Sequence, residues 1–443
     1  MTLQDVRGET LSTDQPAALA AYEQALELLH SLRLDPVAAL QPALDADPDF
    51  ICGHLLMAGL MLSAIDPQVL PQARDSLAAA AAATTRRQPT AREQSLLAAL
   101  QPWAEGDMGR SNRLLDRHLI DHPRDLFALQ LTHLEDLVLG QPTLLRDRIG
   151  RALGSWSEDD PGYGYVLGMH AFGLEECNEY ARAEALGLEA LERNPRDAWA
   201  VHAVAHVYEM QGRAADGIRW LTHGNTLWQQ DNMLAVHNWW HLALQHLRAG
   251  DEAAALAVYD RAIAPNGNSM ALDLVDGSAL LWRLMLRGAD VGDRWQALAA
   301  RWHEWAVPGW FSFNDTHALL AQIGAGEVAR TGELRARIDG VALEDAPAQW
   351  WREAGTACEA MSAFGEGRYR DCARQLLPLL HATHGFGGSQ AQRSLFQITA
   401  MEAARRAGDH ALHEALRSEG MARQAVGGAP QRPPLQRAQL HVA

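Results

Sequence analysis

Lysine is absent from the 443-residue chain, and all 38 of its basic residues are arginine. This absence excludes a Schiff-base lysine, a lysine general base and the lysine of a phosphate-binding loop. Acidic residues outnumber basic ones by 55 to 38, which gives a formal net charge of −17. Since nucleic-acid affinity comes mainly from basic side chains that displace counterions, we expect no nucleic acid among the partners.

Cysteine is scarce, and long apolar runs are missing. The four cysteines lie far apart and form no CxxC pair, which is typical of reduced thiols rather than of a disulfide framework or a zinc knuckle. No apolar stretch approaches the roughly 18–20 residues of a membrane-spanning helix, so we expect no membrane partner. The N-terminus is polar and acidic, unlike a secretory signal. These features together predict a cytoplasmic protein.

Alanine and leucine dominate the composition, while runs of β-branched residues are nearly missing, and this combination favours an all-α fold. A glycine followed by a charged residue recurs along the chain, and each occurrence closes one amphipathic stretch and opens the next. These marks recur about every 38 residues, the length of a helix–turn–helix repeat. The marks are Gly106-Asp107, Gly212-Arg213, Gly250-Asp251, Gly326-Glu327, Gly367-Arg368 and Gly408-Asp409, with Gly140, Gly288 and Glu179-Tyr180 at the remaining places.

A helix pair of this length cannot bury its apolar face alone, so consecutive pairs must stack on one another. We predict about ten such pairs in one continuous array over residues 15–425. A polar segment, residues 1–14, precedes the array. Residues 426–443 are rich in proline, glycine and glutamine and are predicted to be disordered.

The segment 194–216, NPRDAWAVHAVAHVYEMQGRAAD, resembles a tetratricopeptide unit, with its Trp, small residue, Tyr, Gly and Ala in order. A wider likeness to the tetratricopeptide repeat protein 38 family covers nearly the whole chain. It rests on HAVAHVYEMQGR, AVHNWWHLALQHL, ALDLVDGSALLWRL, FNDTHALLA and GGSQAQRSLF. The resemblance implies a helical-repeat protein, here an all-α, tetratricopeptide-like α-solenoid. The family typically carries His where this chain has Gln390, so a role for a ring at that position does not carry over.

Six of the 19 histidines fall at matched positions when the first helices of successive pairs are aligned on their terminal marks. Their offsets from the mark are −13, −10, −9 and −6, which share one helix face at 100° per residue. In a tetratricopeptide solenoid this face lines the concave groove. We therefore predict a groove lined by histidines rather than a core that contains them. The six are His170, His202, His206, His237, His241 and His317.

Two pairs, His202/His206 and His237/His241, have one-turn spacing, so both rings of a pair share a face. Histidines four residues apart suit Zn²⁺ or a similar ion, and adjacent helices about 10 Å apart can share a ligand sphere. These four rings are therefore candidate ligands of a divalent metal such as zinc. Two acidic residues could orient such a ring or act as a base: Glu176 and Glu209.

Two other interpretations of these histidines stay open. They are ordinary groove residues that bond to Glu or to backbone carbonyls, or they contact a small anionic or aromatic ligand. In the second case Trp239 and Trp240 supply stacking surface. Arg393 is the best candidate to grip a carboxylate. The predicted groove lining is His170, His202, His206, His237, Trp240, His241, His317 and Arg393.

A polar cluster at the start of one predicted helix consists of Asn314, Asp315 and His317. Either Asn314 or Asp315 caps this helix, or Asp315 or His317 faces the groove as an acid–base or ligand group. The candidates for a catalytic role are His241, His317 and Asp315. One unit earlier, Asp273 and Asp276 are interpreted as a cap and a solvated position. Cys358 is predicted to be a buried, inert thiol. No HExxH, GxGxxG or phosphate-binding loop is present.

These features predict a helical-repeat binding protein whose concave, His-lined groove holds a small molecule or a peptide segment. The alternative is an enzyme that uses the same groove for metal-assisted or His/Asp acid–base hydrolysis. The enzyme requires the six histidines to converge within a few ångströms in a closed pocket, whereas the binding protein requires an open, continuous groove. The sequence identifies no ligand, leaves this choice open and allows an oligomer.

Overall fold

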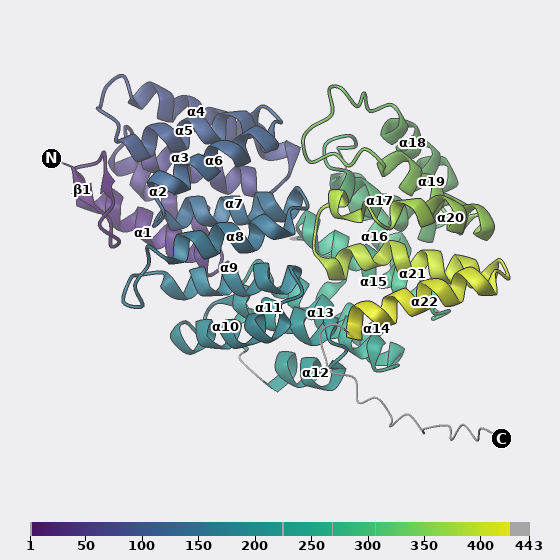
Figure 1. The fold of residues 1–443 in the computed structure, drawn as a ribbon. Helices are drawn as coiled ribbons and strands as arrows, with labels where there is room; N and C mark the ends of the chain where they lie inside the picture. Colours follow the sequence, from purple (N-terminus) through teal and green to yellow (C-terminus); the bar gives the residue numbers. More distant parts are fainter. Residues whose placement is uncertain (1, 224–225, 268, 306, 426–443) are drawn as a thin grey trace, which may run out of the picture.

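The computed structural model describes residues 2–223, 226–267, 269–305 and 307–425. The described residues form 22 α-helices after a short N-terminal hairpin (Figure 1). The first elements are β1 (Leu3–Gln4), β2 (Thr10–Leu11), α1 (Pro16–His30), α2 (Pro36–Ala46), α3 (Ile51–Ser63), α4 (Leu70–Ala83), α5 (Ala91–Ala104), α6 (Met108–Asp121), α7 (Leu126–Val138), α8 (Pro142–Leu153), α9 (Tyr163–Glu176), α10 (Tyr180–Arg193) and α11 (Ala198–Met210). The segment 426–443, predicted to be disordered, lies outside the described residues.

The remaining elements continue the same order of helices. They are α12 (Ala214–His223), α13 (Ala235–Arg248), α14 (Glu252–Val258), α15 (Ala271–Leu286), α16 (Arg294–Trp305), α17 (Ser312–Gly324), α18 (Val328–Asp339), α19 (Ala354–Gly365), α20 (Tyr369–Leu376), α21 (Gln390–Arg406) and α22 (His410–Ala425). Short 3₁₀ turns span Pro67–Val69, Leu227–Gln229, Leu377–Leu379 and Thr383–Phe386, and a π-helical turn spans Tyr259–Ile263.

The helices end and begin where the local sequence predicts. Gly212 follows α11 with a φ of 71°, a left-handed conformation that glycine adopts without steric cost. Asn178 takes the same conformation, with a φ of 65°, one residue before the mark that was placed at Glu179. At the opposite end, the Asp197 side chain accepts a hydrogen bond from the Ala200 amide and caps α11. Short-range chemistry thus sets the boundaries of the helices.

The helices stack in chain order as pairs, which makes the protein an all-α assembly with a helical-repeat-like architecture. From α9 onward, each odd-numbered helix packs on the next odd-numbered one, through α11, α13, α15 and α17 to α19. Each also packs on the even-numbered helix that follows it. The odd-numbered helices therefore form a continuous row, and this row carries the predicted histidines.

The chain curls so that segments far apart in sequence meet (Figure 1). The loop after α1 pairs with the segment before α13, where the Met233 amide donates to the Leu32 carbonyl at 2.7 Å. The Gly388 amide, just before α21, donates to the Leu137 carbonyl of α7 at 3.1 Å. Helix α21 contacts both α11 and α15. This closure covers the inner face of the helices that carry the site.

The N-terminal segment, residues 1–14, includes the antiparallel hairpin of β1 and β2. Leu11 is fully buried, and the Thr13 hydroxyl donates to Asp47 at 2.6 Å. These contacts join the hairpin to the first helix pairs.

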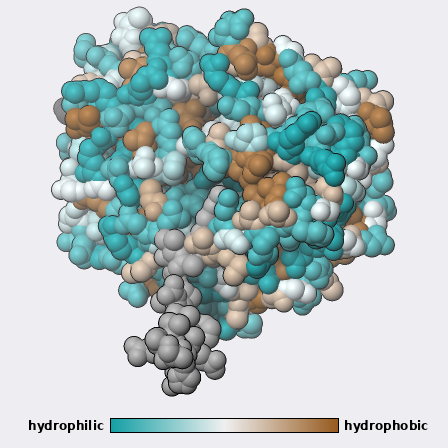
Figure 2. Space-filling view, turned by 45° about the vertical axis from the view of Figure 1, so that its right-hand side comes forward, coloured by the Kyte–Doolittle hydropathy of each residue, from teal (hydrophilic) through white to brown (hydrophobic). Residues whose placement is uncertain are grey.

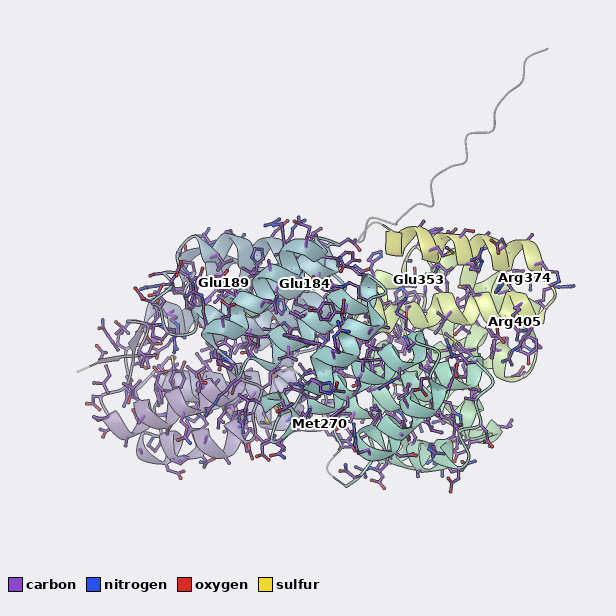
Figure 3. The ribbon with its side chains drawn as sticks, turned by 90° about the horizontal axis from the view of Figure 1, so that it is seen from below. Glu184, Glu189, Met270, Glu353, Arg374 and Arg405 are labelled. Atoms are coloured by element: carbon purple, nitrogen blue, oxygen red, sulfur yellow. The ribbon has the colours of Figure 1, made fainter. Side chains whose placement is uncertain are left out.

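The face shown in Figure 2 is mainly hydrophilic, with apolar residues in small scattered groups. Charged residues stand on the outer helices: Glu184 and Glu189 belong to α10, and the exposed Arg374 and Arg405 lie at the far end of the molecule (Figure 3). In the described part of the chain, no helix combines the length and the apolar character needed to cross a membrane.

Candidate metal centre

Four of the predicted histidines converge on one point between α11 and α13. Helix α11 supplies His202 and His206, and α13 supplies His237 and His241. The ring centroids of His206 and His241 are 4.3 Å apart, and those of His202 and His237 are 4.9 Å apart. One nitrogen from each of the four rings lies within 4.8 Å of the other three. The two one-turn pairs therefore face each other across the helix–helix contact.

The four rings are buried, which differs from the prediction of a groove open to solvent. His202 is 2% exposed, His237 is 4% exposed, and His206 and His241 are fully buried. Helix α21 packs on α11 and closes the side that the repeat pattern assigns to the groove. The helix face was predicted correctly, but this face is covered by the chain itself.

Several ring nitrogens in this cluster have no hydrogen-bond partner among the described residues. They are both nitrogens of His202, both of His206 and Nε2 of His241. A buried polar atom without a partner is costly, so such atoms are rare in folded proteins. Their convergence in one place indicates a site for a group that accepts nitrogen lone pairs.

Three carboxylates face the outer nitrogens of three of the rings. His237 Nδ1 lies 2.9 Å from both oxygens of Asp276, and His241 Nδ1 lies 2.8 Å from Glu209 Oε2. His206 Nδ1 is 3.3 Å from Glu175 Oε2. A carboxylate that accepts from Nδ1–H leaves Nε2 unprotonated and fixes the orientation of the ring, an arrangement typical of histidines that bind metals.

Burial keeps His202, His206 and His241 neutral. It lowers the pKa of His206 to about 4. It also lowers the pKa values of His202 and His241 well below the ordinary range, and the neighbouring histidines lower them further. Burial raises the pKa of Glu209 and of Asp276. Neutral imidazole is the form that binds a metal ion, so these three rings are already in the ligand state at pH 7.

Aromatic side chains hold the rings from the sides. Trp240 stacks on His237 at 5.2 Å between centroids, and Phe172 stacks on His202 at the same distance. Trp240 was predicted as stacking surface for a ligand, whereas here it packs against a histidine of the cluster. Such packing restricts the rotamers of the rings and preorganises the site.

A second acidic group adjoins the cluster at His206. Glu175 and Glu176, at the end of α9, each bring a carboxylate oxygen within 4.8 Å of a His206 nitrogen. Arg393 of α21 pairs with Glu176 at 3.0 Å, and the Gln390 amide donates to the same side chain at 2.7 Å. Arg393 was predicted to grip the carboxylate of a ligand, but it binds a carboxylate of its own chain.

The other predicted site residues lie elsewhere. His170 is half-buried on α9, and its Nε2 lies beside Gly150 of α8. His317 is buried between aromatic rings, and its Nδ1 lies 2.8 Å from the Phe313 carbonyl. In the described part of the chain, neither ring contacts the four clustered rings, so four of the six predicted histidines converge.

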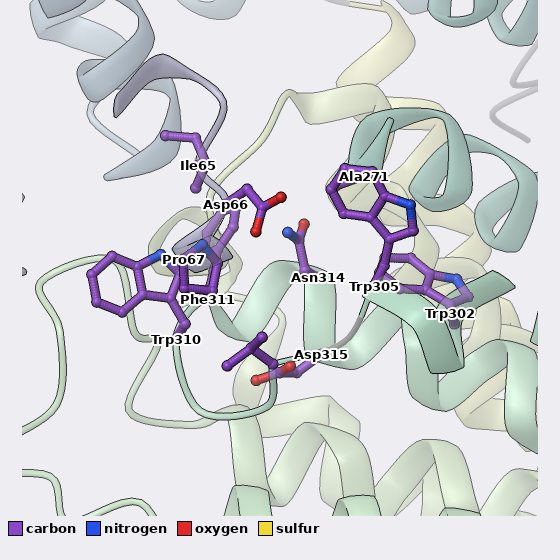
Figure 4. Close-up of a pocket in the computed structure, with 11 residues that line it drawn as sticks. Ile65, Asp66, Pro67, Ala271, Trp302, Trp305, Trp310, Phe311, Asn314 and Asp315 are labelled. Atoms are coloured by element: carbon purple, nitrogen blue, oxygen red, sulfur yellow. The ribbon is translucent and has the colours of Figure 1, made fainter. Parts of the chain in front are cut away.

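Asp315 accepts a hydrogen bond from the Gly309 amide at 2.8 Å, and burial raises its pKa to about 7. Together with Asn314, Trp302 and Trp310 it lines a separate cavity of about 20 Å³ (Figure 4). A cavity of this size holds about one water molecule. Asp315 therefore has no substrate-sized space beside it here.

Two acidic partners of the cluster were missed by the sequence analysis. Asp276 was interpreted as a solvated position, and this was wrong, because its side chain is fully buried and bonded to His237. Its position inside the apolar run ALDLVDGSALLWRL could have indicated burial. A carboxylate in such a run needs a buried partner. Glu175 was also missed, because two adjacent glutamates at the end of a helix are usually exposed to solvent. Asp273, by contrast, caps α15 as predicted.

No model of a known protein family matches the chain. The functional argument therefore rests on the geometry of the four-histidine cluster.

The low pKa of His206 predicts a specific pH dependence of stability. In the range from 6.5 down to about 4, the unfolded chain binds a proton at this ring and the folded chain does not, so stability falls as the pH falls. In metal-free protein, His206→Gln is expected to reduce the loss of unfolding free energy between pH 7 and pH 5 by about 2 kcal/mol. Denaturant unfolding at the two pH values measures this difference.

The control for that experiment is His410→Gln, which changes an exposed ring at the start of α22. It should leave the pH dependence unchanged. Equal pH dependence in wild-type protein and in His206→Gln would show that the ring is not held neutral by burial.

Proposed function

We propose that this chain is a helical-repeat metalloprotein in which His202, His206, His237 and His241 bind one divalent transition metal. The observation that carries the proposal is the convergence of four buried rings, three of which have ring nitrogens without a hydrogen-bond partner among the described residues. Imidazole suits zinc, copper, iron and nickel, and zinc is the ion expected from the sequence.

The size of the cluster supports this proposal. Four nitrogens that each lie 2.0–2.1 Å from one zinc ion are about 3.4 Å from one another in a tetrahedral site. The nitrogens of the cluster lie within 4.8 Å of one another. Each ring would therefore move inward by less than about 1 Å to complete the coordination. The hydrogen bonds of Asp276 and Glu209 to the outer nitrogens of His237 and His241 would make these two rings stronger ligands.

The proposal includes a finer description of the protein. The fold would be a tetratricopeptide-like α-solenoid of about ten helix pairs, related to the tetratricopeptide repeat protein 38 family and located in the cytoplasm. Neither nucleic acid nor membrane would be a partner. Because the histidines are covered, the ligand would be a small molecule beside the metal rather than a peptide along a groove.

A second candidate function is metal-assisted hydrolysis at the same site, and Glu175 favours it. Its carboxyl group is fully buried, both oxygens have no hydrogen-bond partner in the described chain, and it lies 3.3 Å from His206. Burial raises its pKa well above the usual range, with a further contribution from Glu209. A carboxyl group that is kept protonated behind a metal-bound ring can hold or deliver a proton. Hydrolysis would also need an open coordination position on the metal, so one of the four rings would have to leave it.

Elemental analysis of protein purified without an affinity tag or chelator tests the proposal. We expect about one equivalent of zinc or a similar metal per chain. The double variant His202→Ala/His241→Ala should lose this metal, because two ligands are removed. His170→Ala is the matched control, since it removes a predicted groove histidine outside the cluster and should keep the metal.

Two results would contradict the proposal: metal-free wild-type protein that does not take up zinc, or a double variant that retains a full equivalent. Helical circular dichroism of each variant checks that the fold persists. Metal-dependent turnover of small amides or esters that disappears in the double variant would favour the enzyme over the binding protein.

A further inference from the structure

A cavity of about 500 Å³ lies next to the histidine cluster, between α13, α15 and α21. Its size is in the range of sites for small organic ligands. Glu209 forms part of its wall, and the same carboxylate bonds to His241 at 2.8 Å. One side chain therefore separates this cavity from the proposed metal site.

Three arginines line the cavity, which is unusual in a chain with a net charge of −17. Arg248 and Arg287 lie on the exposed ends of α13 and α15, and Arg283 lies deeper, at 6% exposure. Arg287 is paired with Glu252 at 2.8 Å, so Arg248 and Arg283 supply most of the positive charge of the wall. The two acidic residues of the wall offset little of this charge. Glu402 is paired with Arg405 and Arg406, and burial raises the pKa of Glu209.

The contacts of Arg283 are made with neutral groups. Its guanidinium donates to the Ala279 and Ala391 carbonyls and to the Ser394 hydroxyl, at 2.8–3.1 Å. It also lies over the Trp240 ring, 5.4 Å from the centroid. Within the described residues, no carboxylate oxygen lies within 4 Å of it, although a buried charge normally needs an opposite charge. Glu209 and Asp276 attract its charge from a greater distance. The guanidinium is therefore fixed in place without a carboxylate in direct contact.

The rest of the wall is mainly apolar, with Ser394 and His413 as its polar members. Leu244, Leu247, Leu286, Ile398 and Met401 line the space in front of Arg283. An inorganic anion would leave this surface uncovered, whereas an organic acid with an apolar body would cover it. The planar fork of a guanidinium matches the two oxygens of a carboxylate.

We propose that this cavity binds a small amphipathic carboxylate, with its carboxylate on Arg283, its apolar body against the leucines, and Arg248 and Arg287 at the entrance. A ligand bound in this way lies beside Glu209 and so next to the histidine cluster. The inference rests on the cavity alone, and it therefore does not depend on the metal.

Isothermal titration calorimetry with sodium octanoate as the probe tests this inference, on protein with and without chelator treatment. We expect one octanoate per chain, bound at least tenfold more tightly than octanol or inorganic phosphate. Arg283→Gln should weaken octanoate at least tenfold, and Arg248→Glu should weaken it several-fold. Arg374→Glu changes an exposed arginine on α20 that does not line the cavity, and this variant should bind octanoate normally (Figure 3).

Three results would overturn the proposal: no octanoate binding at millimolar concentration, equal binding of octanoate and octanol, or equal binding of octanoate and phosphate. Unchanged binding in a folded Arg283→Gln variant would do the same. Because Arg283 also bonds to α21, this variant could fail to fold, and then Arg248→Glu and the comparison of probes decide. Octanoate binding without metal in His202→Ala/His241→Ala separates this proposal from the metal proposal.

Discussion

Gly140→Ala is expected to lower the unfolding free energy by about 3 kcal/mol, far more than a similar change at other helix ends. Gly140 follows α7 with a φ of 65°, where any side chain is strained. A Cβ atom there would lie 1.8 Å from the His384 carbonyl oxygen and 2.6 Å from the carbonyl carbon. Because these are backbone atoms, the clash cannot be relieved by a rotamer change, and the contact between the two segments must open.

Gly250→Ala is the matched control for this effect. Gly250 also ends a helix with positive φ, at 81°, but a Cβ atom there would meet nothing within 4 Å. Its cost is therefore only the backbone strain, about 1 kcal/mol. Thermal and denaturant unfolding of both variants measure the difference. Equal destabilisation would show that the close approach of Gly140 and His384 is absent in solution.

The contact at Gly140 also affects the histidine cluster. It lies beside the bond between the Gly388 amide and the Leu137 carbonyl, which fixes the start of α21. From there α21 carries Arg393 to Glu176 at the edge of the histidine cluster. Opening this contact should therefore loosen the cover over the cluster as well as the junction itself.

The second large effect is expected for Arg92→Ala, at about 3–5 kcal/mol. Arg92 is buried on α5, and its Nε donates to Asp125 Oδ2 at 2.6 Å. The same oxygen lies 3.0 Å from His118 Nε2, and Asp125 also caps α7 through the Ala128 amide. Burial alone would raise the pKa of Asp125, but the Arg92 charge and the His118 contact hold it well below its usual range. Removing Arg92 leaves a buried carboxylate without its cation.

Arg86→Ala provides the comparison, because Arg86 pairs with Asp49 at the surface, with 53% of the arginine side chain exposed. Water screens this pair, so its loss should cost far less than the loss of the buried pair. Unfolding midpoints of the two variants under identical conditions test the contrast. Similar losses would mean that the buried pair contributes no more than a solvated one.

Much of the fold could be predicted from the local sequence. Composition indicated an all-α protein, and the glycine marks and aspartate caps placed helix ends such as those of α11 correctly. The one-turn spacing of His202 and His206, and of His237 and His241, placed each pair on one face, and the structure brings these faces together. These predictions succeeded because helix ends and helix faces depend on residues only a few positions apart.

The tertiary structure decided whether that face is open or closed. The cover comes from α21, nearly two hundred residues after α11, and the carboxylates of Glu175 and Asp276 come from the neighbouring helices α9 and α15. Each helix pair turns by a small angle on the previous pair, and these angles add up along the array. The total rotation depends on the packing of many small side chains at once, so it cannot be predicted from a local sequence pattern. The sequence alone therefore determined which histidines share a face, and only the curvature of the whole array decided that they are buried together.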